Sequence, residues 1–435
     1  MKITINNKFN KGKVVVTYKF LFLMYLISFL IMPNYSGIKI SSLPLITAQR
    51  FFLIIIYAWT FFNKKIQRNF IDSFKQNKFT FPIIIYLIVC LITTFFTGDI
   101  NAFFGPLVDQ ILAFYLMVYC FKNYLKLDEF LNIIKYLIYI LCILGIFERI
   151  TGFNIFTLLD SGMTQKLNNG SLMRDNVIRI CTAFGHPLTY GLFLTIFFPF
   201  TCYDVNRKKI YILQNPIIII LVVINIILSG SRSCIGTVFF EIFIIFILSD
   251  KKRMGNILVS IIFSALITSA LIFIFYDTSF MEGILRQIFY VIDELFGTSM
   301  ALQFGGNSSI KNSSTYRTLL WSIFTNENFS YFIGKGTIYK PYLIINNRVV
   351  ESIDNFYVNM FIKYAIPGVA SILYIFYTNF KNAFLNLLSN KNKLNYLLIL
   401  LTISYLLNLL IVDELATLKF MFIIFSITIV YGKDI

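Results

Sequence analysis

Apolar runs of about 16–22 residues recur along the whole chain, and they limit what it can fold into more than any other feature. A helix needs about 20 apolar residues to cross the hydrocarbon core of a bilayer. The composition agrees, because 57% of the 435 residues are hydrophobic, against about 45–50% in soluble domains. We therefore predict an all-α polytopic membrane protein, with spans at 18–32, 43–62, 79–96, 103–121, 130–147, 186–203, 212–228, 233–249, 256–276, 357–379, 394–412 and 416–431.

The distribution of lysine and arginine predicts the orientation of these spans. The segments predicted on one side of the membrane, which include both termini, carry 22 Lys and Arg residues. The segments predicted on the other side contain more residues in total but carry only 12. Cytoplasmic loops of membrane proteins are enriched in Lys and Arg. The short loops decide the side, because 207–209 and 251–253 are basic whereas 98–99 and 413–414 are acidic. Both termini are then expected in the cytoplasm.

Two of the predicted external loops are long, at 148–185 and 277–356. Loops beyond about 12–15 residues are usually functional or disordered. The second loop, between the ninth and tenth spans, mixes Gly, Ser and Asn with Trp321, which indicates short helices joined by turns rather than a separate domain. Residues 1–435 are therefore predicted to form a single membrane domain whose external loops contribute to a functional site.

Several classes of function are not expected from the sequence. Six cysteines are present without a C-x-x-C pair, so neither a metal site nor a disulfide framework is indicated. Walker A, dinucleotide-binding and zinc-protease motifs do not occur. The net charge of +17 is explained by cytoplasmic loops, so nucleic acid is not an expected partner.

Four arginines are expected near the external boundary of the membrane: Arg50, Arg179, Arg232 and Arg317. Arg232 lies in Ser-Gly-Ser-Arg-Ser between two apolar runs, and burying its charge at the bilayer centre would cost at least about 2.5–3.5 kcal/mol. The small neighbours leave room for a ligand and for free backbone N–H groups. Arginine binds phosphate bidentately and keeps its charge, so the set suits a phosphate-rich ligand. Snorkelling to the interface is the structural alternative.

Two residues are candidate catalytic groups. His186 is the only histidine, and its place before Pro187 makes a helix-entry role the commoner explanation. Asp354 opens the sequence Asp-Asn-Phe-Tyr, where the alternative is a helix cap. The following span is expected to be interrupted at 366–368, which reads Ile-Pro-Gly.

Taken in order, these segments resemble the superfamily of O-antigen ligases and Wzy-type O-antigen or capsular polysaccharide polymerases. The resemblance covers most of the chain, and each motif is weak alone. The matching positions are Arg50 early in the second span, Glu148-x₃-Gly152, Arg179 to Pro187, Gly230 to Ser233, Arg317-x₃-Trp321, Gly334-x-Gly336 and Asp354-Asn-x-Tyr357.

The resemblance implies a GT-C-type glycosyltransferase fold of about 12 transmembrane helices, in the bacterial cytoplasmic membrane with its active site facing outward. The donor and acceptor would be undecaprenyl-pyrophosphate-linked glycans, in contact with membrane lipid, and a chain-length regulator protein would be a partner. No metal or other cofactor is implied. Carried over by position, Arg179, Arg232 and Arg317 would bind the pyrophosphate with help from Arg50, and Asp354 or His186 would be the base.

Within this superfamily the sequence favours a polymerase over an O-antigen ligase. Ligases commonly have His where this chain has Asp354, and Glu where it has Lys363. A lipid-linked oligosaccharide flippase is a further alternative, but its functional charges would line the midplane between two repeats. A peptidoglycan polymerase of the shape-and-division type is disfavoured because its loop pattern is not seen.

Overall fold

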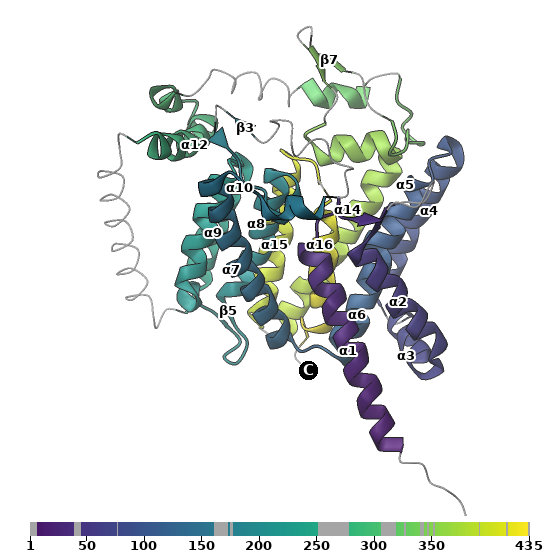
Figure 1. The fold of residues 1–435 in the computed structure, drawn as a ribbon. Helices are drawn as coiled ribbons and strands as arrows, with labels where there is room; N and C mark the ends of the chain where they lie inside the picture. Colours follow the sequence, from purple (N-terminus) through teal and green to yellow (C-terminus); the bar gives the residue numbers. More distant parts are fainter. Residues whose placement is uncertain are drawn as a thin grey trace, which may run out of the picture.

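A bundle of helices forms the body of the protein (Figure 1). The computed structural model describes residues 7–38, 45–75, 77–160, 173–174, 177–250, 278–305, 319–325, 328–339, 343–345, 348–350, 353–390, 392–414 and 416–433. The longer helices are α1 (Asn7–Ile31), α2 (Ala48–Phe62), α3 (Lys64–Lys75), α4 (Thr80–Thr97), α6 (Ala113–Asn123), α7 (Leu127–Thr151), α8 (Pro187–Phe197), α9 (Pro216–Leu228), α10 (Arg232–Leu248), α12 (Ser279–Phe296), α14 (Phe356–Asn390), α15 (Leu394–Leu409) and α16 (Leu418–Val430).

Short elements connect these helices. The helical ones are α5 (Asn101–Gly105), the π-helix η1 (Pro106–Leu112) and the 3₁₀ turns η2 (Ile155–Leu159), η3 (Thr182–Phe184), η4 (Phe198–Cys202), η5 (Ile212–Gln214), η7 (Met300–Phe304) and η8 (Trp321–Thr325). Antiparallel pairs are formed by β1 (Gly37–Ile38) with β2 (Ile46–Thr47), β3 (Met173–Arg174) with β4 (Val177–Ile178), β5 (Tyr203–Asp204) with β6 (Lys209–Ile210), and β7 (Leu343–Ile345) with β8 (Arg348–Val350).

By length and composition, four of the described helices could cross a membrane: Thr80–Thr97, Asn101–Asn123, Leu127–Thr151 and Phe356–Ser389. Shorter apolar helices accompany them at Thr17–Ile31, Ala48–Phe62, Pro187–Cys202, Pro216–Leu228, Leu394–Leu409 and Leu418–Val430. Each predicted span is helical over most of its described length, except the one at 256–276, which lies outside the described residues. The protein is thus an all-α membrane protein, and the number of crossings stays a prediction.

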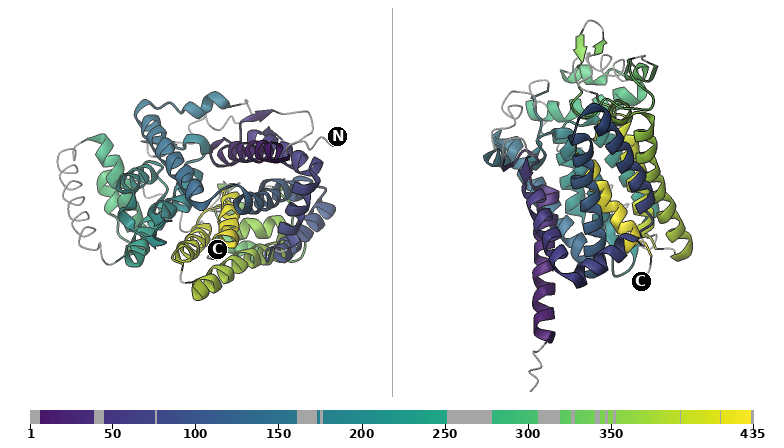
Figure 2. Two further views of the ribbon diagram at one scale, coloured as in Figure 1. Left: turned by 90° about the horizontal axis from the view of Figure 1, so that it is seen from below. Right: turned by 90° about the vertical axis from the view of Figure 1, so that its right-hand side faces the viewer.

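The two ends of the bundle carry different segments. Figure 1 shows α12, β3 and β7 at one end, which we call the α12 end, and α3, β5 and the C-terminus at the other. The basic turn 207–209 joins β5 to β6 and therefore lies opposite α12. In the interior, α16 lies among the other helices (Figure 2), and all its residues except Ile429 are buried.

Two regions differ from the sequence prediction. Segment 63–78 was expected as a loop but contains α3, an amphipathic helix whose Phe74 ring packs 4.4 Å from that of Tyr115, centroid to centroid. The apolar side of such a helix is stabilised by packing, which loop counting does not detect. In 277–356, α12 is longer than the short helices expected, and the β7–β8 hairpin was not predicted.

Helix α14 is interrupted at Ala365, which has φ 57° and ψ −165°. The break lies where 366–368 predicted one, because proline lacks an N–H and clashes with the preceding turn. Segment 331–336 docks on this break and hydrogen-bonds to the backbone groups around it. The bonds run from Lys335 N to Ile362 O (2.8 Å), from Gly336 N to Lys363 O (3.1 Å) and from Ile366 N to Tyr331 O (3.1 Å).

We expect Gly334→Ala to destabilise this docking, because a Cβ there would collide with the backbone carbonyl of Lys363. Overpacking of this kind costs about 1–3 kcal/mol. Thermal unfolding of the purified protein in detergent should show a lower melting temperature. Gly236→Ala is the control, since a Cβ at that position in α10 meets no atom within 4 Å and alanine favours a helix. Equal melting temperatures for Gly334→Ala and wild type would contradict the expectation.

Candidate functional site

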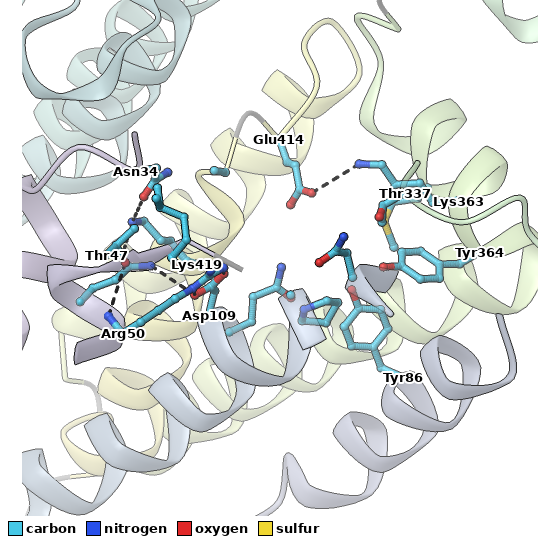
Figure 3. A pocket seen from close by; sticks show the side chains of 18 residues that line it. Asn34, Thr47, Arg50, Tyr86, Asp109, Thr337, Lys363, Tyr364, Glu414 and Lys419 are labelled. Carbon is cyan, nitrogen blue, oxygen red and sulfur yellow. Dashed lines mark hydrogen bonds and ion pairs between the residues drawn. The ribbon is translucent and has the colours of Figure 1, made fainter. Parts of the chain in front are cut away.

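A pocket of about 420 Å³ opens among α2, η1, α14 and the segment that joins α15 to α16, and we call it the central pocket (Figure 3). Charged side chains line it from several elements. They are Arg50, Asp109, Lys363, Glu414 and Lys419. Ionisable groups inside an apolar bundle are expensive and are commonly functional.

Arg50 and Asp109 form a bidentate ion pair on one wall of the central pocket. Arg50 Nε donates to Asp109 Oδ1 at 2.9 Å and Nη2 donates to Oδ2 at 2.5 Å. The third guanidinium nitrogen, Nη1, donates to the carbonyl of Leu45 at 2.9 Å. This fork geometry is the strongest form of carboxylate recognition by arginine. Thr47 caps α2 by accepting from Arg50 N, which helps to set the position of the arginine.

Lys419 lies beside this pair, at the start of α16, and is only 6% exposed. Its ammonium donates to Gln49 Oε1 at 2.9 Å and to Asn34 Oδ1 at 3.1 Å. The ring of Phe29 lies 5.0 Å from the same nitrogen. Within the described part of the chain, no carboxylate is within ion-pairing distance of Lys419. The positive charge is therefore solvated by amides and a ring face, and it adds to the attraction for an anion.

Glu414 projects into the central pocket from the connection between α15 and α16 (Figure 3). Its Oε1 lies 3.9 Å from Lys363 Nζ, which is a long ion pair, and about a fifth of each side chain is exposed. The other oxygen, Oε2, is buried without a hydrogen-bond partner. Burial raises the pKa of Glu414 to about 7, against the opposing effect of Lys363 and with a smaller contribution from Asp413.

Asp99 anchors the segment that closes one side of the pocket. It is 3% exposed and accepts hydrogen bonds from Thr337 Oγ1 at 2.7 Å, from Thr337 N, and from Ile338 N at 3.1 Å. Burial alone would raise the pKa of Asp99, but these bonds and one from Asn101 N outweigh it and hold the pKa below its ordinary value. The carboxylate thus fixes Thr337, which lines the pocket.

A second basic region lies at the turn between α9 and α10, in the direction of α12. Arg179 is 7% exposed, and its Nε donates to the carbonyl of Ser229 at 2.8 Å. Gly230 has φ 61°, and a Cβ there would be 3.0 Å from Arg179 Nε. Arg232 follows at the start of α10, with its guanidinium 5.7 Å from the ring centre of Tyr290 in α12. Gly230 therefore provides both the left-handed backbone conformation of the turn and the space that the Arg179 side chain occupies.

Arg232 stands at one end of a groove of about 300 Å³ between α10, α12 and α15, which we call the α10–α15 groove. Its walls are mostly apolar. They include Gly236, Phe240, Val291, Leu407 and Ile411.

Glu148 supports this region from the end of α7. Its carboxylate accepts from Thr182 N at 2.8 Å, from Cys181 N at 3.2 Å and from Asn154 Nδ2 at 3.3 Å. Gly152 ends the helix in a left-handed conformation, with its N–H bonded to Glu148 O at 2.9 Å. The Glu-x₃-Gly pattern thus organises the stretch that leads from Arg179 into α8.

The structure brings only some of the predicted site residues together. Arg179 and Arg232 both lie at the Gly230 turn but line different cavities, Arg179 one beside Gly230 and Arg232 the α10–α15 groove, whereas Arg50 lines the central pocket with Asp109. Arg317 lies outside the described residues.

The two candidate bases have different surroundings. His186 is the N-cap of α8, and its Nδ1 accepts from Leu188 N at 3.2 Å. Asp354 is an exposed residue just before α14, and the cap is made instead by Asn355, whose Oδ1 accepts from Val358 N at 3.1 Å. Among the described residues there is no group of three or more His, Cys, Asp or Glu that could hold a metal ion.

The sequence did not single out Asp109, Glu414 or Lys419 as site residues. Their positions in the sequence could have identified them. Asp109 and Lys419 are single charged residues inside apolar runs, and Glu414 follows the end of such a run. No protein-family model matches the chain, and no curated protein matches it.

We expect Asp109→Asn to destabilise the protein, because Arg50 would keep its charge without a counter-ion. Breaking a fully buried pair costs about 3–5 kcal/mol, and since each side chain is 24% exposed we expect about 2–3. Thermal unfolding in detergent measures the effect. The double variant Arg50→Met/Asp109→Leu removes both charges and should recover part of the loss. A single variant that melts like wild type would show that the pair contributes nothing to stability.

Proposed function

We propose that this protein is a metal-independent glycosyltransferase that joins undecaprenyl-pyrophosphate-linked oligosaccharide repeat units into O-antigen or capsular polysaccharide. In this proposal the fold is of GT-C type with about twelve crossings in the bacterial cytoplasmic membrane. The α12 end faces outward, because the basic turn 207–209 lies at the opposite end and basic loops favour the cytoplasm. Both termini are then cytoplasmic.

The observation that carries the proposal is the pairing of arginines with an apolar groove. Arg179 and Arg232 flank the Gly230 turn, and Arg232 stands at the end of the α10–α15 groove. A ligand with an anionic head and a long hydrocarbon tail matches this arrangement, because arginine binds phosphate and the groove walls bind the chain. A polyprenyl pyrophosphate has both parts.

The chemistry follows from the charges. The acceptor hydroxyl attacks the anomeric carbon of the donor glycan, and the bond to pyrophosphate breaks with its electron pair on the phosphate oxygen. Arg179, Arg232 and Arg317 stabilise that charge. Fixed donors of this kind are worth about 2.7–4 kcal/mol each in the transition state. Asp354 is the first of the sequence-predicted bases and His186 the second, since the Nδ1 of His186 already serves the helix cap.

A lipid-linked oligosaccharide flippase is the second candidate. The observation that favours it is the break in α14 at Ala365, beside the central pocket. Transporters often bind their substrates at discontinuous helices. A flippase would move the lipid-linked unit without changing its length, whereas a polymerase would lengthen it.

The direct test uses purified protein and lipid-linked repeat units, without added metal or nucleotide. A ladder of products differing by one repeat is expected from a polymerase. In cells, deletion of a polymerase leaves single repeats attached to the final acceptor, whereas deletion of a ligase leaves polymer on the carrier lipid. Intact lipid-linked units after incubation, with polymer still made in the deletion strain, would overturn the proposal.

We expect Arg232→Ala to slow polymerisation by about 10²–10³-fold, the loss that follows removal of one transition-state donor. The rate of ladder formation by the purified variant measures this effect. Arg207→Ala is the matched control, because Arg207 is an exposed arginine in the basic turn opposite α12, 3.8 Å from Asp204. An Arg232→Ala enzyme as fast as the Arg207→Ala enzyme would remove Arg232 from the site.

A further inference from the structure

The central pocket has the polar lining that a sugar requires. Its side chains provide amide donors and acceptors, hydroxyl groups and two tyrosine rings. They include Asn34, Gln49, Asn101, Gln110, Tyr86 and Tyr364. Groups of this kind hydrogen-bond to hydroxyls in both directions.

Two acceptor atoms in the central pocket lack a protein partner. Gln110 Oε1 and Glu414 Oε2 are both buried without a hydrogen bond. Buried polar atoms in native proteins are nearly always paired, so such exceptions call for a ligand or solvent. Gln110 is placed there by the π-helix η1, which brings both Gln110 and the neighbouring Asp109 to the pocket. Segments of π-helix occur frequently at functional sites.

Glu414 differs from the carboxylates of Asp109, which also lines the pocket, and Asp99, which anchors the segment that closes it. Asp109 is held by Arg50, and Asp99 by Thr337 and its neighbours. Glu414 has only the long contact to Lys363 at 3.9 Å. Figure 3 shows its carboxylate between the group around Arg50 and the group around Lys363. Among the described residues that line the central pocket, Glu414 is the one whose carboxylate has an oxygen without a hydrogen bond to the protein.

The central pocket is adjacent to the α10–α15 groove. Ile411 lines the groove and Glu414 lines the pocket. Three residues of chain span at most about 11 Å between Cα atoms. The connection between α15 and α16 thus contributes to the linings of both cavities.

We propose that the central pocket binds the acceptor glycan and that Glu414 is the base that takes the proton of its attacking hydroxyl. This inference rests on the proposed function, and in it Glu414 replaces the sequence-predicted Asp354 and His186 as the base. The proton passes from the acceptor oxygen to a Glu414 carboxylate oxygen while that acceptor oxygen forms the new bond to the anomeric carbon. The bond to the donor pyrophosphate breaks, and its electron pair leaves on the phosphate oxygen near Arg232.

The environment of Glu414 suits this role. A general base is most effective when its pKa lies near the working pH, and burial raises the pKa of Glu414 to about 7. Polymerisation should therefore fall as the pH drops through about 7, because protonated Glu414 cannot accept a proton. The charged or titratable groups that face it or lie around the same pocket are Lys363, Asp413, Tyr86, Tyr364, Tyr405, Asp109, Arg50 and Lys419.

The test measures ladder formation by purified variants across pH 5.5–9, with lipid-linked repeat units extracted from a strain that lacks the protein. Glu414→Gln should lower the rate at least ~10²-fold, the usual contribution of a positioned base. Asp413→Asn is the matched carboxylate control. It should keep the wild-type rate at pH 8. The acid limb of its pH–rate profile, where the rate falls at low pH, should move to lower pH, because removing a neighbouring negative charge lowers the pKa of Glu414.

Lys363→Met gives an independent measurement that does not alter the base. Removal of the cation should move the acid limb of the pH–rate profile to higher pH, and the position of that limb rather than the plateau rate is the readout. Gln110→Leu should raise the substrate concentration needed for half-maximal rate by several-fold, because one acceptor in the pocket is lost.

The outcomes separate the two proposals. A wild-type protein that forms no ladder overturns the proposed function. A wild-type ladder with a Glu414→Gln rate within threefold of it overturns the role of Glu414 and leaves the polymerase intact. If Glu414→Gln does not elute as a single folded species, the Lys363→Met profile decides, and an unmoved acid limb overturns the inference.

Discussion

The cost of placing charge inside an apolar bundle governs this structure. An ionised side chain in hydrocarbon costs several kcal/mol unless it finds a partner or a wet cavity. Arg50 forms an ion pair with Asp109, Lys419 donates hydrogen bonds to two side-chain amides, and Glu148 accepts hydrogen bonds from backbone N–H groups. These arrangements join segments that are distant in the chain, and the first two of them also line the central pocket.

Backbone groups obey the same constraint. A helix interrupted within a membrane protein leaves N–H and C=O groups that must be satisfied internally. In α14 this is done by segment 331–336, and Asp99 then fixes Thr337 beside it. The large connecting region is therefore partly a structural element of the bundle rather than a separate layer. Its close approach explains why glycine is needed at 334.

Sequence reasoning found the helices and the local motifs because each depends on neighbouring residues. Apolar run length predicted the apolar helices, and Ile-Pro-Gly predicted the break in α14. It did not find the pairing of Arg50 with Asp109, which are 59 residues apart, since one sequence carries no distance between helices. For the same reason Arg50 was grouped with Arg179 and Arg232, although it lines a different pocket.

The separation of these arginines has a mechanistic consequence. A transfer between two lipid-linked glycans needs one site that stabilises a leaving pyrophosphate and another that binds an uncharged hydroxyl near a base. A single cluster of arginines would satisfy only the first requirement. Here Arg50 is neutralised by Asp109, which leaves the central pocket mixed in charge. Arg232 lines the α10–α15 groove instead, and the connection between α15 and α16 contributes residues to both cavities. In the proposed polymerase, therefore, donor and acceptor would meet at that connection, and the base is expected on it rather than among the arginines.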